Sequence, residues 1–249
     1  MNLSLGTAQL GLHYGIANYH GPLTDVEAWR LLDAAWGCGI RHLDTAPIYG
    51  KAEERINQWH KWNAMRMFEV TTKVRHDQGT RLDRPCRRLW HYLDESDVEP
   101  MADVDGMSCL SGDDVRRLGC YPYGIYQLPA SALDDRSDRI MGELYLLGFD
   151  VQVRSLLIQG HATQLPFLRR FADDFGLTIP ALCVRWAYEL PVDTAIVGAE
   201  TPQQVEENAA AFADGPLPRE LVELILELRP TVPEWAISPR TWGQKYDFG

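Results

Sequence analysis

The chain has 249 residues and a formal net charge of −11, from 24 lysines and arginines against 35 aspartates and glutamates. Nucleic acids and anionic membrane surfaces would repel such a chain over most directions of approach, so we expect neither as a partner. A length of 249 residues with 45% hydrophobic content suits one large domain, and we predict a single domain over residues 1–249.

Targeting and redox signals are weak. The first residues lack the basic start and apolar core of a secretory signal, and no apolar run approaches the roughly 20 residues that cross a bilayer. We therefore expect a cytoplasmic protein. The five cysteines show no Cys-x-x-Cys spacing, so neither a disulfide framework nor a metal site is predicted.

Apolar runs alternate with amphipathic stretches along the first part of the chain. Thr24 and Glu27 are spaced as a capping box, and Gly37 and Gly39 would end the helix that the box begins. Such alternation is typical of βαβ units and a parallel sheet. We predict strands at 3–9, 40–43 and 68–73, and helices at 24–36, 52–62 and 85–93.

The regular spacing breaks in the middle of the chain. Three apolar runs, at 104–110, 117–121 and 125–128, lie only a few residues apart. A parallel crossover needs about a dozen residues or more, so these runs cannot be three neighbouring parallel strands. Either one of them is not a standard barrel strand, or the local topology differs.

The alternation returns after residue 130. Thr201 stands as a helix cap, followed by Pro202 at the first helical position and Gln204 at the third, which is a strong helix start. We predict helices at 134–147, 165–175, 179–190 and from 201 onward, with strands at 150–155 and 194–197.

Three polar side chains stand at predicted strand ends. Asp44 and Tyr49 lie five residues apart after one strand, and Lys73 ends the next. An ammonium favours a phenolate, so Lys73 should lower the phenol's usual pKa of about 10, while Asp44 keeps the lysine charged. This group suits a general acid that protonates a carbonyl oxygen. The alternative is an ordinary buried ion pair beside a core tyrosine.

Six segments of the sequence, in this order, resemble the aldo/keto reductase family: 5–18, 43–50, 71–74, 127–129, 153–160 and 197–208. The resemblance runs from residue 3 to about residue 242. It implies an α/β fold of the (β/α)8 TIM-barrel type, which we expect to be incomplete or remodelled around residues 104–128. It also implies an NAD(P)H-dependent oxidoreductase that reduces a carbonyl, or oxidises the alcohol, of a small molecule, with Asp44, Tyr49 and Lys73 as catalytic residues.

The resemblance further implies a binding site for NADP or NAD. The amino end of the helix after the final strand, which begins at residue 201, suits a phosphate. Where many relatives carry the lysine and arginine that grip a 2′-phosphate, this chain has Gly198 and Gln204, so the cofactor preference stays open. The matching positions are Gly6 and Thr7 at the first strand, Gln127, Arg154 and Ser155 around the nicotinamide and pyrophosphate, and Gly198, Gln204, Glu207 and Asn208 at the last helix.

The chain departs from the family pattern at the catalytic histidine. The run 105–110 resembles the family's fourth strand and places Leu110 where the histidine is expected. Losing such a hydrogen-bond donor typically lowers the rate about 10² to 10³-fold. His76 and His161, on predicted loops at the carboxyl ends of strands, are candidates to replace it.

A second departure lies at 115–122, which resembles the family's fifth strand without its Ser-Asn pair. The flanking helices are also shortened, which should open one wall of the barrel to a protein partner, to self-association or to a larger substrate. Two alternative functions stay open. The missing histidine and the uncertain nicotinamide clamp would suit a non-redox lyase, isomerase or cyclase, and the opened wall would suit a catalytically weak, reductase-like binding or regulatory subunit.

Overall fold

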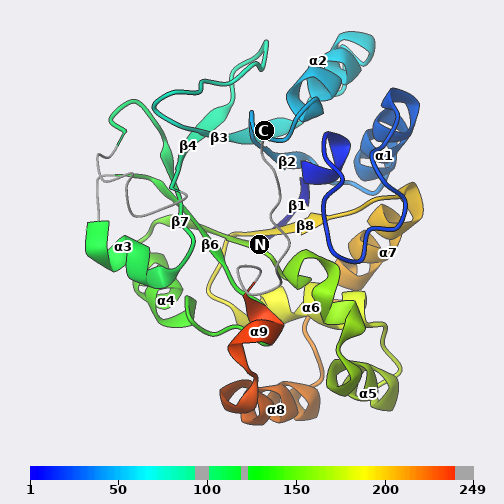
Figure 1. Ribbon diagram of the computed structural model, residues 1–249, viewed down its shortest axis with the longest axis vertical. Coiled ribbons are helices and arrows are strands. Elements are labelled where there is room, and N and C mark those ends of the chain that lie inside the picture. The colour runs from blue at the N-terminus through cyan, green and yellow to red at the C-terminus, as the bar shows by residue number, and fades with distance from the viewer. Residues whose placement is uncertain (93–100, 119–122, 239–249) are drawn as a thin grey trace.

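The computed structural model describes residues 1–92, 101–118 and 123–238. Eight parallel strands in these residues close into a barrel, in chain order, with β1 paired to β8 (Figure 1). The predicted α/β barrel is confirmed. The strands are β1 (Asn2–Gly6), β2 (His42–Thr45), β3 (Glu69–Val74), β4 (Arg87–His91), β5 (Gly106–Ser108), β6 (Ile125–Pro129), β7 (Asp150–Arg154) and β8 (Thr194–Gly198).

Helices surround most of the barrel (Figure 1). The predicted caps are confirmed: Thr24 and Glu27 form the capping box, and the Thr201 side chain accepts the backbone N–H of Gln204. The helices are α1 (Asp25–Gly37), α2 (Ala52–Trp62), α3 (Gly112–Leu118), α4 (Asp138–Leu146), α5 (Pro166–Asp174), α6 (Ile179–Arg185), α7 (Pro202–Ala213), α8 (Arg219–Leu228) and α9 (Glu234–Ile237), with 3-10 turns at Ala8–Leu10, Ile158–Gln164, Trp186–Glu189 and Arg229–Thr231.

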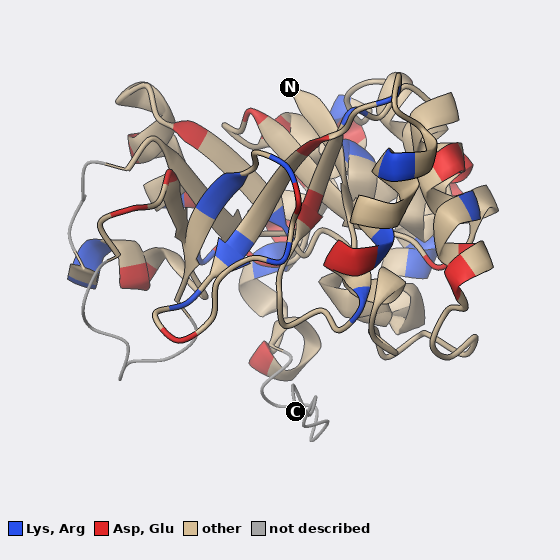
Figure 2. Ribbon diagram, turned by 90° about the horizontal axis from the view of Figure 1, so that it is seen from above, with Lys and Arg blue, Asp and Glu red and all other residues tan. Residues whose placement is uncertain are grey.

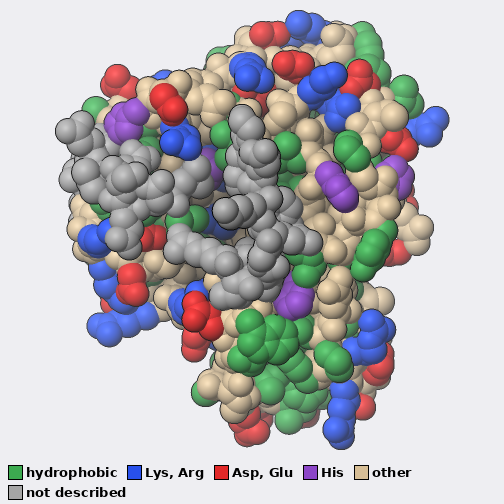
Figure 3. All heavy atoms as spheres, viewed as in Figure 1, with side chains coloured by type: hydrophobic (Ala, Val, Ile, Leu, Met, Phe, Trp, Pro, Cys, Tyr) green, Lys and Arg blue, Asp and Glu red, His purple; other side chains and the backbone are tan. Residues whose placement is uncertain are grey.

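The surface is mixed in character. Basic and acidic residues are interspersed along the ribbon in the view from above (Figure 2). Hydrophobic side chains gather over α8 and α9, at the bottom of Figure 3, where Leu224, Leu226 and Trp235 are exposed. Among the described residues, no helix has the length and apolar character to cross a membrane.

The helix predicted at 85–93 is wrong, because Arg87–His91 forms strand β4 between β3 and β5. Leu89 and Trp90 point to opposite faces of the sheet and are both fully buried. The alternation of buried and exposed residues that marks a half-exposed strand is therefore absent, and periodicity alone cannot separate a short apolar run from a helix. Each strand after β4 is therefore one position later in the barrel order than the sequence predicts.

The structure assigns two of the three closely spaced apolar runs to barrel strands. Residues 106–108 form the fifth strand rather than the fourth, and 125–129 form the sixth. The strand predicted at 117–121 is wrong at residues 117 and 118, which belong to α3, while 119–121 lie outside the described residues. One of the three runs is therefore not a barrel strand, as their close spacing required.

The sheet itself is complete through residues 104–128, so the predicted incompleteness does not lie in the strands. In the part of the chain that the structure describes, the outer layer lacks helices earlier, after β3 and after β4. The residues between β3 and β4, 75–86, contain no helix, and neither do the described residues between β4 and β5. Figure 1 shows a loop between β3 and β4, whereas α3 follows β5 and α4 follows β6 in the chain.

His60, near the end of α2, gives the fold a dependence on pH. It is 2% exposed, and burial together with Arg84 lowers its pKa to about 4. The unfolded chain then binds more protons than the folded chain below about pH 6.5, so stability should fall from pH 6.5 towards pH 4, by at most about 1.4 kcal/mol per pH unit. Urea unfolding across this range should show a shallower loss for His60→Gln. An unchanged slope would contradict the assignment.

Candidate active site

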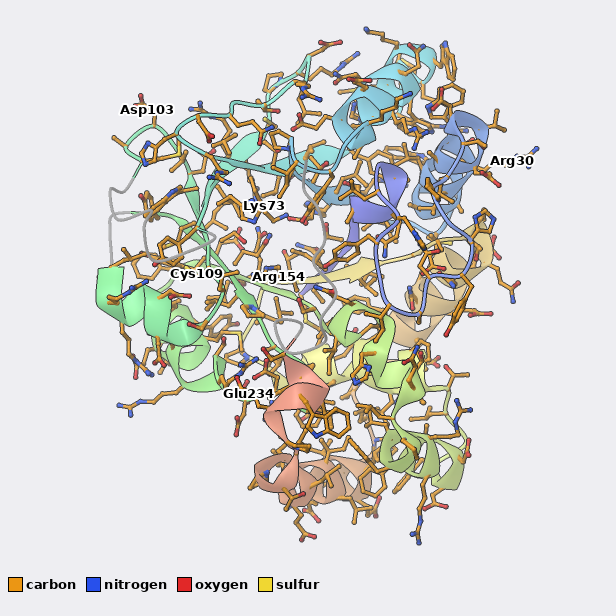
Figure 4. The ribbon with its side chains drawn as sticks, in the orientation of Figure 1. Arg30, Lys73, Asp103, Cys109, Arg154 and Glu234 are labelled. Carbon is orange, nitrogen blue, oxygen red and sulfur yellow. The ribbon has the colours of Figure 1, made fainter. Side chains whose placement is uncertain are left out.

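A buried ion pair joins β2 and β3 inside the barrel. Lys73 Nζ lies 2.5 Å from Asp44 Oδ2 and donates a second hydrogen bond to the Thr45 carbonyl at 3.2 Å. Both side chains are almost fully buried. Two buried charges are tolerated only when they are paired and hydrogen-bonded, which is the case for this pair. Figure 4 shows Lys73 within the ring of strands.

Tyr49 completes the predicted group. It lies in the turn between β2 and α2, with its Oη 3.5 Å from Lys73 Nζ, and the ammonium is 5.2 Å from the centre of its ring. The structure therefore brings Asp44, Tyr49 and Lys73 together, as the sequence predicts. All three lie at or just beyond the carboxyl ends of β2 and β3, the face where barrel enzymes place their active sites.

The predicted direction of the Tyr49 pKa is wrong. Burial raises the pKa of Tyr49 above its usual value, and the negative charge of Asp44 raises it further, while Arg154 acts in the opposite sense. Burial also lowers the pKa of Lys73, and Asp44 only partly offsets this effect. The negative charge of Asp44 thus offsets much of the stabilisation that the positive charge of Lys73 would give to a Tyr49 phenolate. At neutral pH the Tyr49 phenol keeps its proton.

A series of side-chain hydrogen bonds links Asp44 to strands β5 and β6 across the barrel interior. Gln127 donates from Nε2 to Asp44 Oδ1 at 2.8 Å and accepts from Ser108 Oγ at 2.9 Å. Thr7 donates to the backbone carbonyl of Asp44 at 2.9 Å. Ser108 is not among the predicted site residues, because the run that contains it resembles the family's fourth strand rather than the fifth. Both carboxylate oxygens of Asp44 are engaged, so its orientation is fixed by side chains from β3 and β6.

Arg154 places a second positive charge at the site. At the end of β7, its Nη2 donates to the Cys109 carbonyl at 2.6 Å and its Nη1 to Ser155 Oγ at 3.2 Å. Figure 4 shows Arg154 and Cys109 beside each other inside the barrel. The guanidinium is therefore anchored to the neighbouring wall, close enough to influence the pKa of Tyr49 and of Lys73.

A histidine ends the true fourth strand. His91 pairs in register with Ser108, is 7% exposed, and its Nδ1 has no partner among the described residues. Burial and then the charges of Lys73 and Arg154 hold its pKa well below 6.5, so the ring is neutral at pH 7. The placement of Leu110 at the end of the fourth strand is wrong, because Leu110 follows β5.

The two predicted substitutes lie elsewhere. The His76 ring is 6.3 Å from the ring of Trp90, a side chain on the outer face of β4. The His161 ring, in the 3-10 turn after β7, is 6.2 Å from that of Trp235 in α9. Neither histidine ends a barrel strand, whereas His91 does.

The nine predicted cofactor residues gather at the carboxyl ends of β1, β6, β7 and β8 and in α7. Gly6 pairs in register with both Asp44 and Gly198, and Asn208 donates to the Gly198 carbonyl at 3.4 Å. Gln204 Oε1 accepts the backbone N–H of Glu200 at 2.7 Å, and Glu207 accepts from Gln203 at 2.8 Å. Gln204 and Glu207 are thus already hydrogen-bonded within the protein.

The loop after β7 is strained. Ser155, Ile158 and Gln159 have φ of 68°, 50° and 54°, values that L-residues rarely adopt and that concentrate at functional sites. The Gln159 carbonyl accepts the N–H of Ile16, which ties this loop to the one after β1. Gln159 Oε1 and His91 Nδ1 are buried without partners in the described part of the chain. A bound group with its own donors and acceptors fits these residues.

Removing one member of the buried ion pair should destabilise the fold. Asp44→Ala leaves Lys73 unpaired, and we expect the free energy of unfolding to drop by about 3 to 5 kcal/mol in urea titrations. Asp44→Ala combined with Lys73→Met should recover much of the loss. The control is Asp83→Ala, which breaks the exposed pair with Lys61 at 3.0 Å and should cost less than about 1 kcal/mol. Equal losses for Asp44→Ala and Asp83→Ala would contradict the assignment.

The chain is similar to several known proteins. Over 74 residues, the chain is 42% identical to D-threo-aldose 1-dehydrogenase from Pseudomonas sp.. This match covers 28% of the chain and only 22% of that relative. Among solved structures, an aldo-keto reductase from Bacillus halodurans in its holo form matches with a TM-score of 0.71 and 19% identity over 91% of each chain. Another, from a deep-sea metagenome, matches with a TM-score of 0.68 and 20% identity over 98% of this chain and 96% of its own.

These structural matches, at such low identity, support the fold alone. The family assignment comes from the model of the aldo/keto reductase family, which matches residues 2–100 and 126–229. The first of these segments contains β1 to β4 and the second contains β7, β8 and nearly all of β6. Since the match spans well over half of the sequence, the chain belongs to the aldo/keto reductase family of oxidoreductases.

Proposed function

We propose that this protein is an NAD(P)H-dependent oxidoreductase that reduces the carbonyl of a small molecule, or oxidises the corresponding alcohol. The observation that carries the proposal is the Tyr49 hydroxyl 3.5 Å from a buried lysine that is itself paired with Asp44. His91 ends the neighbouring strand. A proton donor, two cationic neighbours and a neutral imidazole at one barrel mouth suit the protonation of a carbonyl oxygen.

The bound nicotinamide would supply hydride to the carbonyl carbon. Gly6, Thr7, Ser155 and the amino end of α7 would hold the cofactor, while Arg154 and Gln127 border the ring end of the site. Tyr49 carries its proton at neutral pH because its pKa is raised. It donates this proton to the carbonyl oxygen as negative charge develops there, and the Lys73 and Arg154 charges stabilise the phenolate that remains.

His91 acts as the second hydrogen-bond donor to the carbonyl oxygen. A neutral imidazole carries one N–H, and a donor aimed at a developing oxyanion is worth about 10² to 10³-fold in rate. Because the pKa of His91 is held well below 6.5, it neither gains a charge nor competes with Tyr49 as the acid at neutral pH.

The position of His91 also bears on the alternative functions. A missing family histidine, an uncertain nicotinamide clamp and an opened barrel wall would favour a non-redox lyase, isomerase or cyclase, or a catalytically weak regulatory subunit. A buried histidine at the end of β4 weighs against both alternatives. We therefore favour the oxidoreductase.

The site does not favour a 2′-phosphate. Gln204 carries no charge, its Oε1 is taken by the Glu200 N–H, and the Glu200 carboxylate adds a negative charge nearby. Tryptophan fluorescence during titration with NADH and with NADPH tests both the function and the preference. We expect both to bind, with NADH at least as tight as NADPH. Binding of neither would overturn the proposed function, and a strong preference for NADPH would overturn the cofactor assignment.

Substrate class can be surveyed with the same preparation. The partial relative is named as an aldose dehydrogenase, so a panel of aldoses and simple aldehydes is the natural choice, with nicotinamide absorbance as the readout. Turnover of any member that depends on NAD(P)H or NAD(P)+ supports the oxidoreductase. Turnover without a change in nicotinamide absorbance would point instead to the non-redox alternative.

A further inference from the structure

An open groove lies on the outside of the barrel where a helix is absent. Residues 80–85, here called the strap, lead to the start of β4 without forming a helix. Between the strap and α2 lies a groove of about 270 Å³, here called the β3 groove. Its lining includes His60, Phe68, Val70, Leu82, Arg84 and Pro85.

The strap is fixed in place by α2. The Glu53 carboxylate, 1% exposed, accepts hydrogen bonds from the Thr80 hydroxyl at 2.7 Å and from the backbone N–H of Arg81 at 2.8 Å. Asn57 donates to the Arg81 carbonyl at 2.8 Å and accepts from the Asp83 N–H at 3.0 Å. Four hydrogen bonds thus define one wall of the β3 groove, so its shape does not depend on a loose loop.

The floor of the β3 groove is apolar. Phe68, just before β3, and Val70 in β3 are buried, and Leu82 and Pro85 of the strap also line the groove. A volume of 270 Å³ equals about nine waters at roughly 30 Å³ each, which suits a ligand of about eight to ten non-hydrogen atoms. Apolar walls would gain from burying a hydrocarbon chain of that size.

Two hydrogen-bond donors, His60 and Arg84, are among the residues that line the β3 groove. His60 Nε2 accepts the backbone N–H of Phe68 at 3.2 Å, so the neutral ring keeps its proton on Nδ1. Within the described part of the chain, the Arg84 guanidinium donates one hydrogen bond, to the Met67 sulfur at 3.1 Å, and forms no ion pair with a carboxylate. Its neighbour Asp83 is already paired with Lys61. A guanidinium without a carboxylate, beside a buried imidazole N–H, matches an anionic head group.

We propose that the β3 groove binds a small amphiphilic carboxylate, whose apolar chain lies over Phe68, Val70 and Leu82 and whose carboxylate pairs with Arg84 and His60. This ligand site lies outside the barrel and is separate from the mouth where Tyr49 sits. In a chain of net charge −11, selective capture of an anion requires such a local cation.

Isothermal titration with octanoate tests the proposal, with neutral octanamide and the shorter hexanoate as matched ligands. We expect octanoate to bind the wild-type protein and octanamide to bind at least tenfold more weakly. Hexanoate should bind roughly fifteenfold more weakly, from about fourfold for each CH₂ removed. Arg84→Gln should weaken octanoate at least tenfold, while Arg81→Gln, which removes a strap arginine paired with Glu54, should not.

Binding at the barrel mouth is the competing explanation, and the variants separate the two. Octanoate held near Tyr49 would bind Arg84→Gln as tightly as wild type, and that result would overturn the proposal. Absence of binding at millimolar octanoate would also overturn it. Leu82→Glu places a like charge on the wall of the β3 groove and should abolish octanoate binding, with circular dichroism confirming that the variant is folded.

Discussion

Tyr49→Phe should lower kcat for carbonyl reduction by about 10² to 10⁴-fold, because the reaction loses its proton donor while the ring and its packing remain. The affinity for the nicotinamide cofactor should be nearly unchanged, since the lost hydroxyl contacts Lys73 rather than the predicted cofactor residues. Steady-state kinetics and the fluorescence titration measure the two quantities on one sample. The loss should therefore appear in kcat with cofactor binding retained.

A matched control separates the chemistry from general damage. Tyr19→Phe removes the hydroxyl of a tyrosine that is 86% exposed and should leave kcat unchanged. The pH profile adds a second check: because the pKa of Tyr49 is raised, wild-type reduction should show no loss across the neutral range from deprotonation of this group. Normal turnover by Tyr49→Phe would show that another group supplies the proton.

The clustering of Asp44, Tyr49 and Lys73 could be predicted because its signals are local. Asp44 and Lys73 each end an apolar run, and parallel strands bring such ends together at one mouth. The helix caps at Thr24 and Thr201 could likewise be predicted, because each cap is recognised from a pattern of four consecutive residues. The pKa of Tyr49 could not be predicted from its neighbours in sequence. Its direction depends on how deeply the phenol is buried and on how far Asp44 cancels the lysine charge, and both need the fold.

The fourth and fifth strands could not be predicted for a different reason. The last three residues of β4 are buried in succession, without alternation, and β5 is only three residues long. Gly106 permits β5 to approach β6 closely, because a Cβ there would lie 2.1 Å from the Ile125 carbonyl oxygen. A three-residue strand with a glycine gives almost no periodicity to detect. Because β4 was missed, the end of the fourth strand was expected at residue 110, whereas the structure has it at residue 91.

His91→Leu should lower kcat by about 10² to 10³-fold, since it removes one hydrogen-bond donor to the developing oxyanion and leaves Tyr49 in place. His91→Gln keeps an N–H donor in a side chain of similar length and should recover part of the rate. Stability should change little by comparison, because Nδ1 of His91 has no partner to lose among the described residues. Steady-state kinetics at saturating cofactor, together with urea unfolding, would measure both effects.

The other positions considered for this role supply the controls. Leu110→Ala, His76→Gln and His161→Gln should each leave kcat within a few-fold of wild type, because none of them alters the end of β4. If His161→Gln caused the large loss and His91→Leu did not, the second donor would come from the loop after β7. Because the pKa of His91 is held well below 6.5, wild-type kcat should also stay level between pH 7 and pH 6, whereas an ordinary exposed histidine would titrate there.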